Sequence, residues 1–202
     1  MNYSMVLYIL GYILQFESAF LMLPALVSLI YQEEAGIPFV ITAAICLVLG
    51  IVFTHKKPSS STVYTREGFV TVALSWIVMS IFGAIPFVWN GDFPYYVDAL
   101  FETVSGFTTT GSSILSDVES LSHASLFWRS FSHWIGGMGV FVFIMSILPL
   151  MGGSTINLMK AESPGPSVSR LVPHIKDTAK ILYGIYLAIT LLEIVILCAL
   201  GM

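Results

Sequence analysis

The stretch FETVSGFTTTGSS, residues 101–113, decides the fold that we predict for this chain. It starts as a short apolar helix candidate and continues into a strip of hydroxyl-bearing residues and glycine. Hydrophobic segments of membrane-spanning length flank it on both sides. Backbone polar groups outside a helix cannot face lipid, so at membrane depth this strip must be buried in protein or line a watery path. The stretch is therefore predicted to be a pore loop.

The composition is that of an integral membrane protein. Of its 202 residues, 56% are hydrophobic and only 10% are charged, whereas soluble domains contain about 25% charged residues. Five apolar runs approach or exceed the ~20 residues needed to cross the hydrocarbon core, at residues 5–31, 37–53, 68–88, 124–150 and 178–201. The expected fold class is an all-α membrane protein with five spanning helices.

The chain is expected to divide into three parts: an N-terminal transmembrane helix pair at 1–60, a first pore repeat at 61–165, and a linker with the first helix of a truncated second repeat at 166–202. Within the first pore repeat we expect a helix at 68–88, a pore helix at 94–107, a filter at 108–113 and a helix at 124–150. A pore helix of this length reaches only about 20 Å, so it goes halfway into the membrane. Pro94 suits the first turn of that helix.

The basic residues indicate the orientation, because cytoplasmic loops are enriched in Lys and Arg. Seven of the eight basic residues lie between the second and third runs or between the fourth run and the start of the fifth. The N-terminus and the loops 54–67 and 151–177 are therefore predicted to be cytoplasmic in a multi-pass protein of the cell membrane. Arg129 is the exception. The pore loop then enters from an acidic external surface, which concentrates cations.

The hydroxyl strip carries the ligands that an alkali cation needs. Backbone carbonyls replace the hydration shell of the ion in a cation filter, and four equivalent loops surround it. Thr108, Thr109 and Thr110 favour an extended backbone, and Gly111 is free to adopt a positive φ that turns a carbonyl toward the pore axis. The alternative is an ordinary loop rich in Ser and Thr.

Four carboxylates lie in or near the membrane segments. Asp98 and Glu102 share a face of the pore-helix candidate, where they either attract cations or anchor the loop, and we favour anchoring for Glu102. Glu17 and Glu193 lie inside spanning segments, where carboxylates are costly and therefore functional candidates. A packing or assembly role for these two is at least as well supported as ion handling.

The sequence shows no well-supported set of catalytic residues. His123 and His133 lie ten residues apart on one helix, about 15 Å along its axis, so they cannot chelate one metal together. Ser105 stands in a context that resembles the serine motif of intramembrane proteases but lacks the glycine expected two residues earlier. We expect no enzymatic activity. The glycines at 136, 137 and 139 let helices approach closely, either to line a pore or simply to pack.

Several motifs in order resemble TrkH-type subunits of the Trk/Ktr/HKT superfamily of potassium transporters, specifically their N-terminal part. The motifs are REGF at 66–69, GAIPF at 83–87, SGFTTTGSS at 105–113, WIGGMGV at 134–140, ILPL at 147–150 and AESPGP at 161–166. The run at 177–202 is similar to the start of the second repeat of that family.

The resemblance implies a pore built from four helix–loop–helix repeats, each supplying one quarter of a potassium filter. It implies that Thr109, Thr110 and Gly111 contact K⁺, with Thr108 and Ser112 flanking them, and that K⁺ is the transported ion, with no other cofactor. The implied partners are the remaining pore repeats, a second copy, a cytosolic TrkA-like nucleotide-binding regulatory subunit and the lipid membrane, with no nucleic acid. Only one repeat is complete, so we expect this chain to be a fragment.

Three hypotheses follow. In the first, the chain is part of a Trk-type transporter for potassium uptake and supplies one quarter of the selectivity filter. In the second, it is a small homotetrameric cation channel in which four chains each contribute one loop. In the third, it is a non-conducting membrane assembly protein whose loop only packs against partners.

Overall fold

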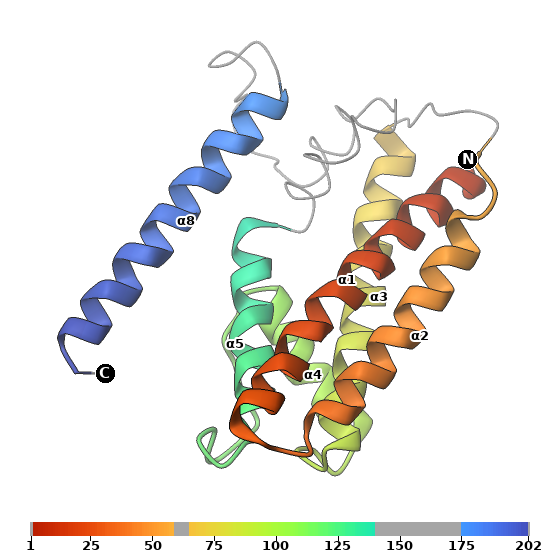
Figure 1. The fold of residues 1–202 in the computed structure, drawn as a ribbon. Helices are drawn as coiled ribbons and strands as arrows, with labels where there is room; N and C mark the ends of the chain where they lie inside the picture. Colours follow the sequence, from red (N-terminus) through yellow and green to blue (C-terminus); the bar gives the residue numbers. More distant parts are fainter. Residues whose placement is uncertain (1, 59–64, 140–174, 202) are drawn as a thin grey trace.

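The computed structural model of the chain describes residues 2–58, 65–139 and 175–201, and these ranges contain helices and no strand. The helices are α1 (Tyr3–Tyr31), α2 (Gly36–Thr54), α3 (Thr65–Trp89), α4 (Tyr96–Phe107), α5 (His123–Met138) and α8 (Ile175–Ala199). Figure 1 shows α1 to α5 in one bundle, with α8 beside α5 at its edge.

Within the described ranges, four helices are long and apolar enough to cross a membrane: Tyr3–Tyr31, Gly36–Thr54, Glu67–Trp89 and Lys180–Ala199. The predicted all-α membrane fold is thus confirmed. The fourth run, expected at 124–150, is described only as far as the 16 residues of α5. Gly139 ends that helix with a φ of +67°, so the helix does not continue unbroken as predicted, and residues 140–150 lie outside the described ranges.

The short helix α4 starts later than Pro94. Tyr95 is the N-cap, with the extended angles φ −123° and ψ 141°, and the first helical residue is Tyr96. Because proline disfavours a helical conformation in the residue before it and fixes its own φ, Pro94 shapes the approach to the helix instead of forming its first turn. Asp98 lies in the first turn of α4, where a carboxylate interacts favourably with the helix dipole.

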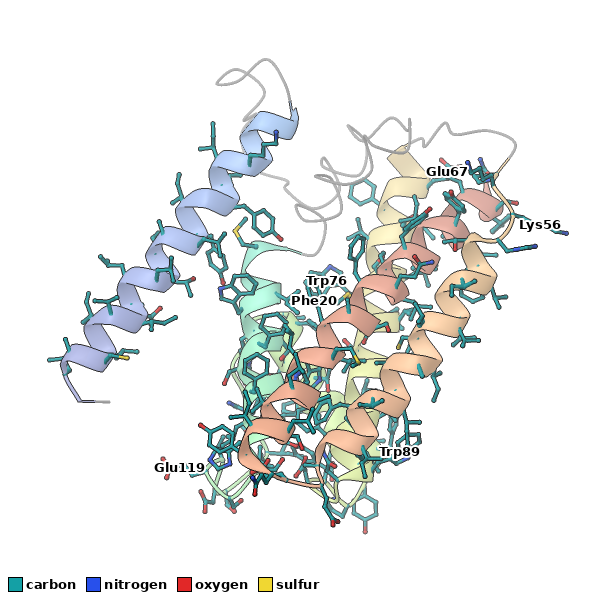
Figure 2. The ribbon with its side chains drawn as sticks, viewed as in Figure 1. Phe20, Lys56, Glu67, Trp76, Trp89 and Glu119 are labelled. Carbon is teal, nitrogen blue, oxygen red and sulfur yellow. The ribbon has the colours of Figure 1, made fainter. Side chains whose placement is uncertain are left out.

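The segment from α3 to α5 leaves and re-enters the bundle at one end. Figure 2 places Trp89, the last residue of α3, and Glu119, which precedes α5, at the same end of the bundle. Lys56 and Glu67 lie at the opposite end. Helix α4 runs alongside α5 and does not extend to the end where α3 begins (Figure 1). The chain between α3 and α5 therefore dips into the bundle and returns.

Helices α1 and α2 form a tightly packed antiparallel pair. The Ser18 hydroxyl donates to the Ala43 carbonyl at 2.7 Å, and the Gln15 side-chain amide donates to the Thr54 hydroxyl at 2.9 Å. A Cβ atom added to Gly50 would lie 2.7 Å from the Gly11 carbonyl oxygen. Small residues allow such close backbone approach between membrane helices, so Gly50 sets the separation of the pair.

An aromatic cluster joins this pair to α4 and α5. Trp128 of α5 is fully buried, as are Phe39 of α2 and Phe107 of α4. The Trp128 ring lies edge-on to the Phe107 ring at a centroid distance of 6.2 Å and to the Phe39 ring at 6.4 Å. The Trp128 indole N–H donates to the Gly83 carbonyl of α3 at 2.9 Å. One side chain thus ties together the helices that surround α4.

Gly50→Ala tests the contact between α1 and α2. The added methyl group meets backbone atoms that cannot rotate away, so the free energy of unfolding should fall by about 1–3 kcal/mol. Thermal denaturation of the chain in lipid or mild detergent measures this change. Gly184→Ala is the control, because no described atom lies within 4 Å of its added Cβ. An equal loss of stability in both variants would contradict this packing.

Candidate functional site

The filter segment, which we define as residues 108–113, begins where α4 ends. The Thr109 N–H donates to the Gly106 carbonyl at 3.0 Å, and the Thr110 N–H donates to the Ser105 carbonyl at 3.0 Å. This pair of bonds is the Schellman arrangement that closes many helices. Thr108 has φ −83° and ψ −1°, and Thr109 has φ +57°. The extended backbone predicted for these two threonines is therefore wrong, because the helix end captures their N–H groups.

Thr109 adopts a conformation that is rare for its residue type. A left-handed φ is usual for glycine at a helix end, but a β-branched side chain is crowded there. Strained backbone of this kind costs on the order of 1–3 kcal/mol and is concentrated at functional sites. The propensity of threonine for strands could not reveal this conformation.

Gly111 does adopt a positive φ, of +73°, with no atom within 4 Å of an added Cβ. Residues 108–112 are all exposed. Within the described ranges, the carbonyls of Thr109, Thr110 and Gly111 accept no hydrogen bond, whereas the Ser112 carbonyl accepts one from the Ser105 hydroxyl at 2.6 Å. Three successive carbonyls thus remain open to an external ligand, and the fourth is tied back to α4.

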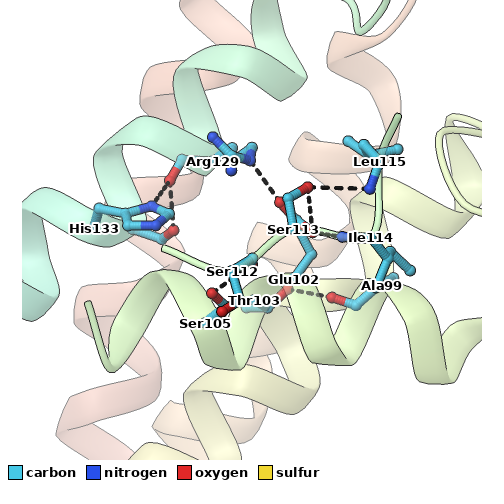
Figure 3. Close-up of polar contacts among 11 residues, drawn as sticks. Ala99, Glu102, Thr103, Ser105, Ser112, Ser113, Ile114, Leu115, Arg129 and His133 are labelled. Atoms are coloured by element: carbon cyan, nitrogen blue, oxygen red, sulfur yellow. Dashed lines mark hydrogen bonds and ion pairs between the residues drawn. The ribbon is translucent and has the colours of Figure 1, made fainter. Parts of the chain in front are cut away.

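Glu102 anchors the segment that follows these carbonyls (Figure 3). Its side chain is only 1% exposed. The Arg129 Nε atom of α5 donates to Glu102 Oε1 at 2.6 Å, while the Ser113 hydroxyl and the Ile114 N–H donate to Glu102 Oε2 at 3.1 and 3.4 Å. A buried carboxylate is stable when it is paired and hydrogen-bonded in this way. The structure thus supports the anchoring role favoured for Glu102.

The pairing of Arg129 with Glu102 was not predicted from the sequence, in which Arg129 is the one basic residue on the otherwise acidic side of the protein. The isolation of Arg129 could have indicated an ion pair, because a lone cation at membrane depth needs an anion nearby.

The glycines of α5 serve close packing. A Cβ on Gly136 would clash with the Phe107 carbonyl, and one on Gly137 would lie 2.5 Å from the Tyr186 hydroxyl of α8. The Tyr186 hydroxyl in turn donates to the Trp134 carbonyl at 3.0 Å. The backbone of α5 therefore lies directly against Phe107, the last residue of α4, on one side and against α8 on the other.

Two carboxylates, Asp92 and Glu33, tie the ends of α3 and α1 to α5. The Ser125 hydroxyl donates to Asp92 at 2.5 Å, and burial raises the pKa of Asp92 despite that bond. Glu33 accepts bonds from the backbone N–H groups of His123 and Ala124 at 3.1 and 3.4 Å. The His123 Nδ1 atom lies 2.6 Å from Glu33. Glu33 therefore neutralises the positive end of the α5 dipole.

Partial burial raises the pKa of Glu33, but hydrogen bonds from the His123 ring and from the backbone of His123 and Ala124 outweigh it. The net effect is a pKa below its ordinary value of 4.5. The ring of Tyr31 stacks on that of His123 at a centroid distance of 3.9 Å. His123 thus belongs to this contact between helices, and within the described residues no group of three or more metal-ligating side chains includes it.

Removal of the Arg129 cation should destabilise the protein strongly. Arg129→Met leaves Glu102 buried without its counter-charge, so the free energy of unfolding should fall by about 3–5 kcal/mol. Thermal denaturation measures the loss. Glu119→Gln removes an exposed carboxylate from the loop that precedes α5 and should change stability by less than about 0.5 kcal/mol. Equal effects would show that the ion pair contributes nothing.

The Glu33 contact predicts a loss of stability in acid. A carboxylate with a lowered pKa in the folded state stabilises the protein above its unfolded pKa, and the stabilisation is lost as pH falls through the folded pKa. Melting temperature measured from neutral pH to about pH 3 should therefore fall less steeply for Glu33→Gln than for the unchanged chain. Glu34→Gln, at an exposed neighbour, should keep the original slope. An unchanged slope in Glu33→Gln would refute the assignment.

Known proteins of similar sequence and structure show the family to which the chain belongs. The TrkH family model, described as a cation transport protein, matches residues 36–200. The potassium uptake protein TrkH of Salmonella typhimurium is 37% identical over 205 residues, which cover 100% of this chain and 41% of that protein. TrkG of Escherichia coli is 37% identical over 180 residues, covering 87% of the chain and 37% of that protein.

The crystal structure of the potassium transporter TrkH from Vibrio parahaemolyticus superposes with a TM-score of 0.74 and 33% identity. The match covers 95% of this chain and 38% of that one. The chain thus spans about two fifths of the length of the relatives described above. With a family match over most of its length and the same fold as a solved member, this multi-pass membrane chain belongs to the TrkH family of cation transport proteins.

Proposed function

We propose that this chain takes part in potassium uptake and supplies one quarter of the selectivity filter of a Trk-type transporter. The observation that carries the proposal is the row of three open carbonyls at Thr109, Thr110 and Gly111, at the end of a half-length helix. Carbonyls that accept no bond from protein are available to replace the water molecules around a K⁺ ion. Thr108 and Ser112 flank this row.

The hydroxyls of the threonines support the same proposal. The Thr108 hydroxyl donates to the Val104 carbonyl at 2.7 Å and lies 2.9 Å from the Thr110 hydroxyl. This bond holds the two side chains together on the exposed side of the turn. The proposed ligands are therefore all oxygen atoms, which suit a hard alkali cation better than a transition metal.

One loop surrounds only part of an ion, because a carbonyl ring of this type is built from four loops. The remaining three quarters would come from further pore repeats, consistent with the greater length of the relatives. Relatives named as potassium uptake proteins of the Trk system support K⁺ as the transported ion. No further cofactor is proposed.

The ion pair between Glu102 and Arg129 holds the filter segment without binding the ion. Glu102 directs both oxygen atoms at protein donors, and the adjacent guanidinium balances its charge. Exposed carboxylates would instead attract cations to the entrance, among them Glu119 (Figure 2), Asp117 in the same loop and Glu34 in the loop between α1 and α2. Such surface charges raise the local cation concentration and act over about one Debye length.

The distribution of charge supports the proposed sidedness. Lys56 lies at the end of the bundle opposite Glu119, so the positive-inside rule makes the end with Lys56 cytoplasmic and the filter entrance external. The loops 54–67 and 151–177 would then face the cytosol, where a TrkA-like nucleotide-binding subunit would bind. Pairing with a second copy of the transporter within the membrane completes the proposed assembly.

Gly111→Ala tests the filter assignment. The methyl group disfavours the φ of +73° by about 1–2 kcal/mol, which would rotate the neighbouring carbonyls out of line. We expect the ratio of potassium to sodium uptake to fall about tenfold, the effect of about 1.4 kcal/mol. The measurement is ion uptake by cells that lack their own potassium uptake systems and express this chain in place of the matching part of Escherichia coli TrkH.

Two further variants complete this experiment. Thr110→Ala should also lower the ratio, whereas Ser120→Ala, which removes an exposed hydroxyl outside the filter segment, should leave it unchanged. An unaltered ratio in both filter variants, with normal amounts of folded protein, would favour the assembly-protein hypothesis. Potassium flux through the chain alone in liposomes, together with cross-linked tetramers, would favour the homotetrameric channel.

A further inference from the structure

Glu17 is a carboxyl group that the proposed ion path does not use. It lies about midway along the 29 residues of α1, and its side chain is fully buried, with 0% exposed. Neither of its oxygen atoms has a hydrogen-bond partner in the part of the chain that the structure describes. The adjacent Ser18, by contrast, bonds to α2. Glu17 is therefore an isolated acid in the interior of the helix bundle.

The groups around Glu17 offer it no cation. The titratable neighbours that interact with it are the Cys46 thiol of α2 and the Tyr96 hydroxyl of α4, and the backbone of Gly83 in α3 lies beside its carboxyl. The Tyr96 hydroxyl already donates to the Ile81 carbonyl at 2.7 Å. Arg129, the basic residue of α5, is paired with Glu102. No basic side chain in the described ranges bonds to Glu17.

An ionised carboxylate in this position would be very unfavourable. A charge removed from water must be paired, hydrogen-bonded or neutralised, and the middle of a spanning helix is where the cost is highest. Glu102 shows how this chain stabilises a buried carboxylate, with an arginine and two further donors. Glu17 has none of these partners.

We propose that Glu17 is a proton-binding site whose carboxyl group is held as an uncharged acid at the junction of α1, α2 and α3. The bound proton neutralises the group, so neither a metal cation nor a basic side chain is required. The neutral acid also provides an O–H donor and a carbonyl acceptor, which suit a site formed by backbone and a thiol. This inference does not depend on the proposed transport of K⁺.

Because of where Glu17 lies, its protonation affects the layer of residues that packs behind α4. A Cβ atom on Gly83 would lie 3.0 Å from Thr103 and 3.3 Å from Phe107, so the residue beside Glu17 packs directly behind the pore helix. Phe107 immediately precedes the filter segment. A charged group here would draw water or cations into the layer that supports the filter. The uncharged acid keeps this layer dry, and Glu17 is in this sense a positioning residue.

Infrared spectroscopy of the whole chain in lipid bilayers tests the proposal. At neutral pH we expect the carbonyl stretching band of a protonated carboxylic acid, and this band should shift when the glutamate carboxyls are isotope-labelled. The band should disappear in Glu17→Gln, which should fold and melt within about 4 °C of the unchanged chain. It should survive in Glu193→Gln, the matched control, because Glu193 lies within a spanning helix but is exposed on α8.

Two results would overturn the proposal. One is a carboxylate band that vanishes in Glu17→Gln and shifts when potassium is replaced by a bulky organic cation, which would identify a cation site. The other is the absence of any labelled acid band at neutral pH. If Glu17→Gln does not fold, the labelled Glu193→Gln chain decides the matter. Its acid band at neutral pH supports protonated Glu17, and the lack of that band refutes it.

Discussion

The fold depends on one constraint, which is that lipid cannot hydrogen-bond the backbone at the end of a half-length helix. The chain meets this constraint by packing α4 against α3 and α5 and by closing its end with bonds to Ser105 and Gly106. Trp128 of α5 packs on Phe107 of α4 and bonds to the backbone of α3. Once the helix end is closed in this way, the next carbonyls have no partner among the described residues and are exposed in a row. Closure of the helix end thus both satisfies its backbone groups and leaves free the carbonyls that we propose as ion ligands.

Two buried carboxyls show how charge is handled around this re-entrant segment. Glu102 is paired with Arg129 and accepts hydrogen bonds from Ser113 and Ile114. Glu17 has no such partners, and we infer that it is neutral. The difference follows from position, since Glu102 lies beside the segment that follows α4, whereas Glu17 lies at the junction of α1, α2 and α3.

The backbone conformation predicted from local sequence was wrong where a tertiary contact or a helix end outweighs the intrinsic preference of a residue. Thr108 and Thr109 were expected to be extended because threonine favours strands, but the end of α4 draws both into helical and left-handed conformations. The run from 124 to 150 was expected to be one helix on hydrophobicity alone, yet Gly139 ends α5. Hydrophobic length shows that a segment belongs in the membrane, whereas the dihedral angles of a single glycine decide where the helix stops.

The sequence by itself determined that this is an all-helical membrane protein with a re-entrant segment, since hydrophobic length and a misplaced polar strip are properties of consecutive residues. Its ordered motifs also determined the family. Only the tertiary structure decided which partner each buried charge finds. Glu102 and Arg129 are 27 residues apart, and Glu33 and His123 are 90 residues apart. No local pattern encodes such pairs, because they arise from the packing of whole helices against one another.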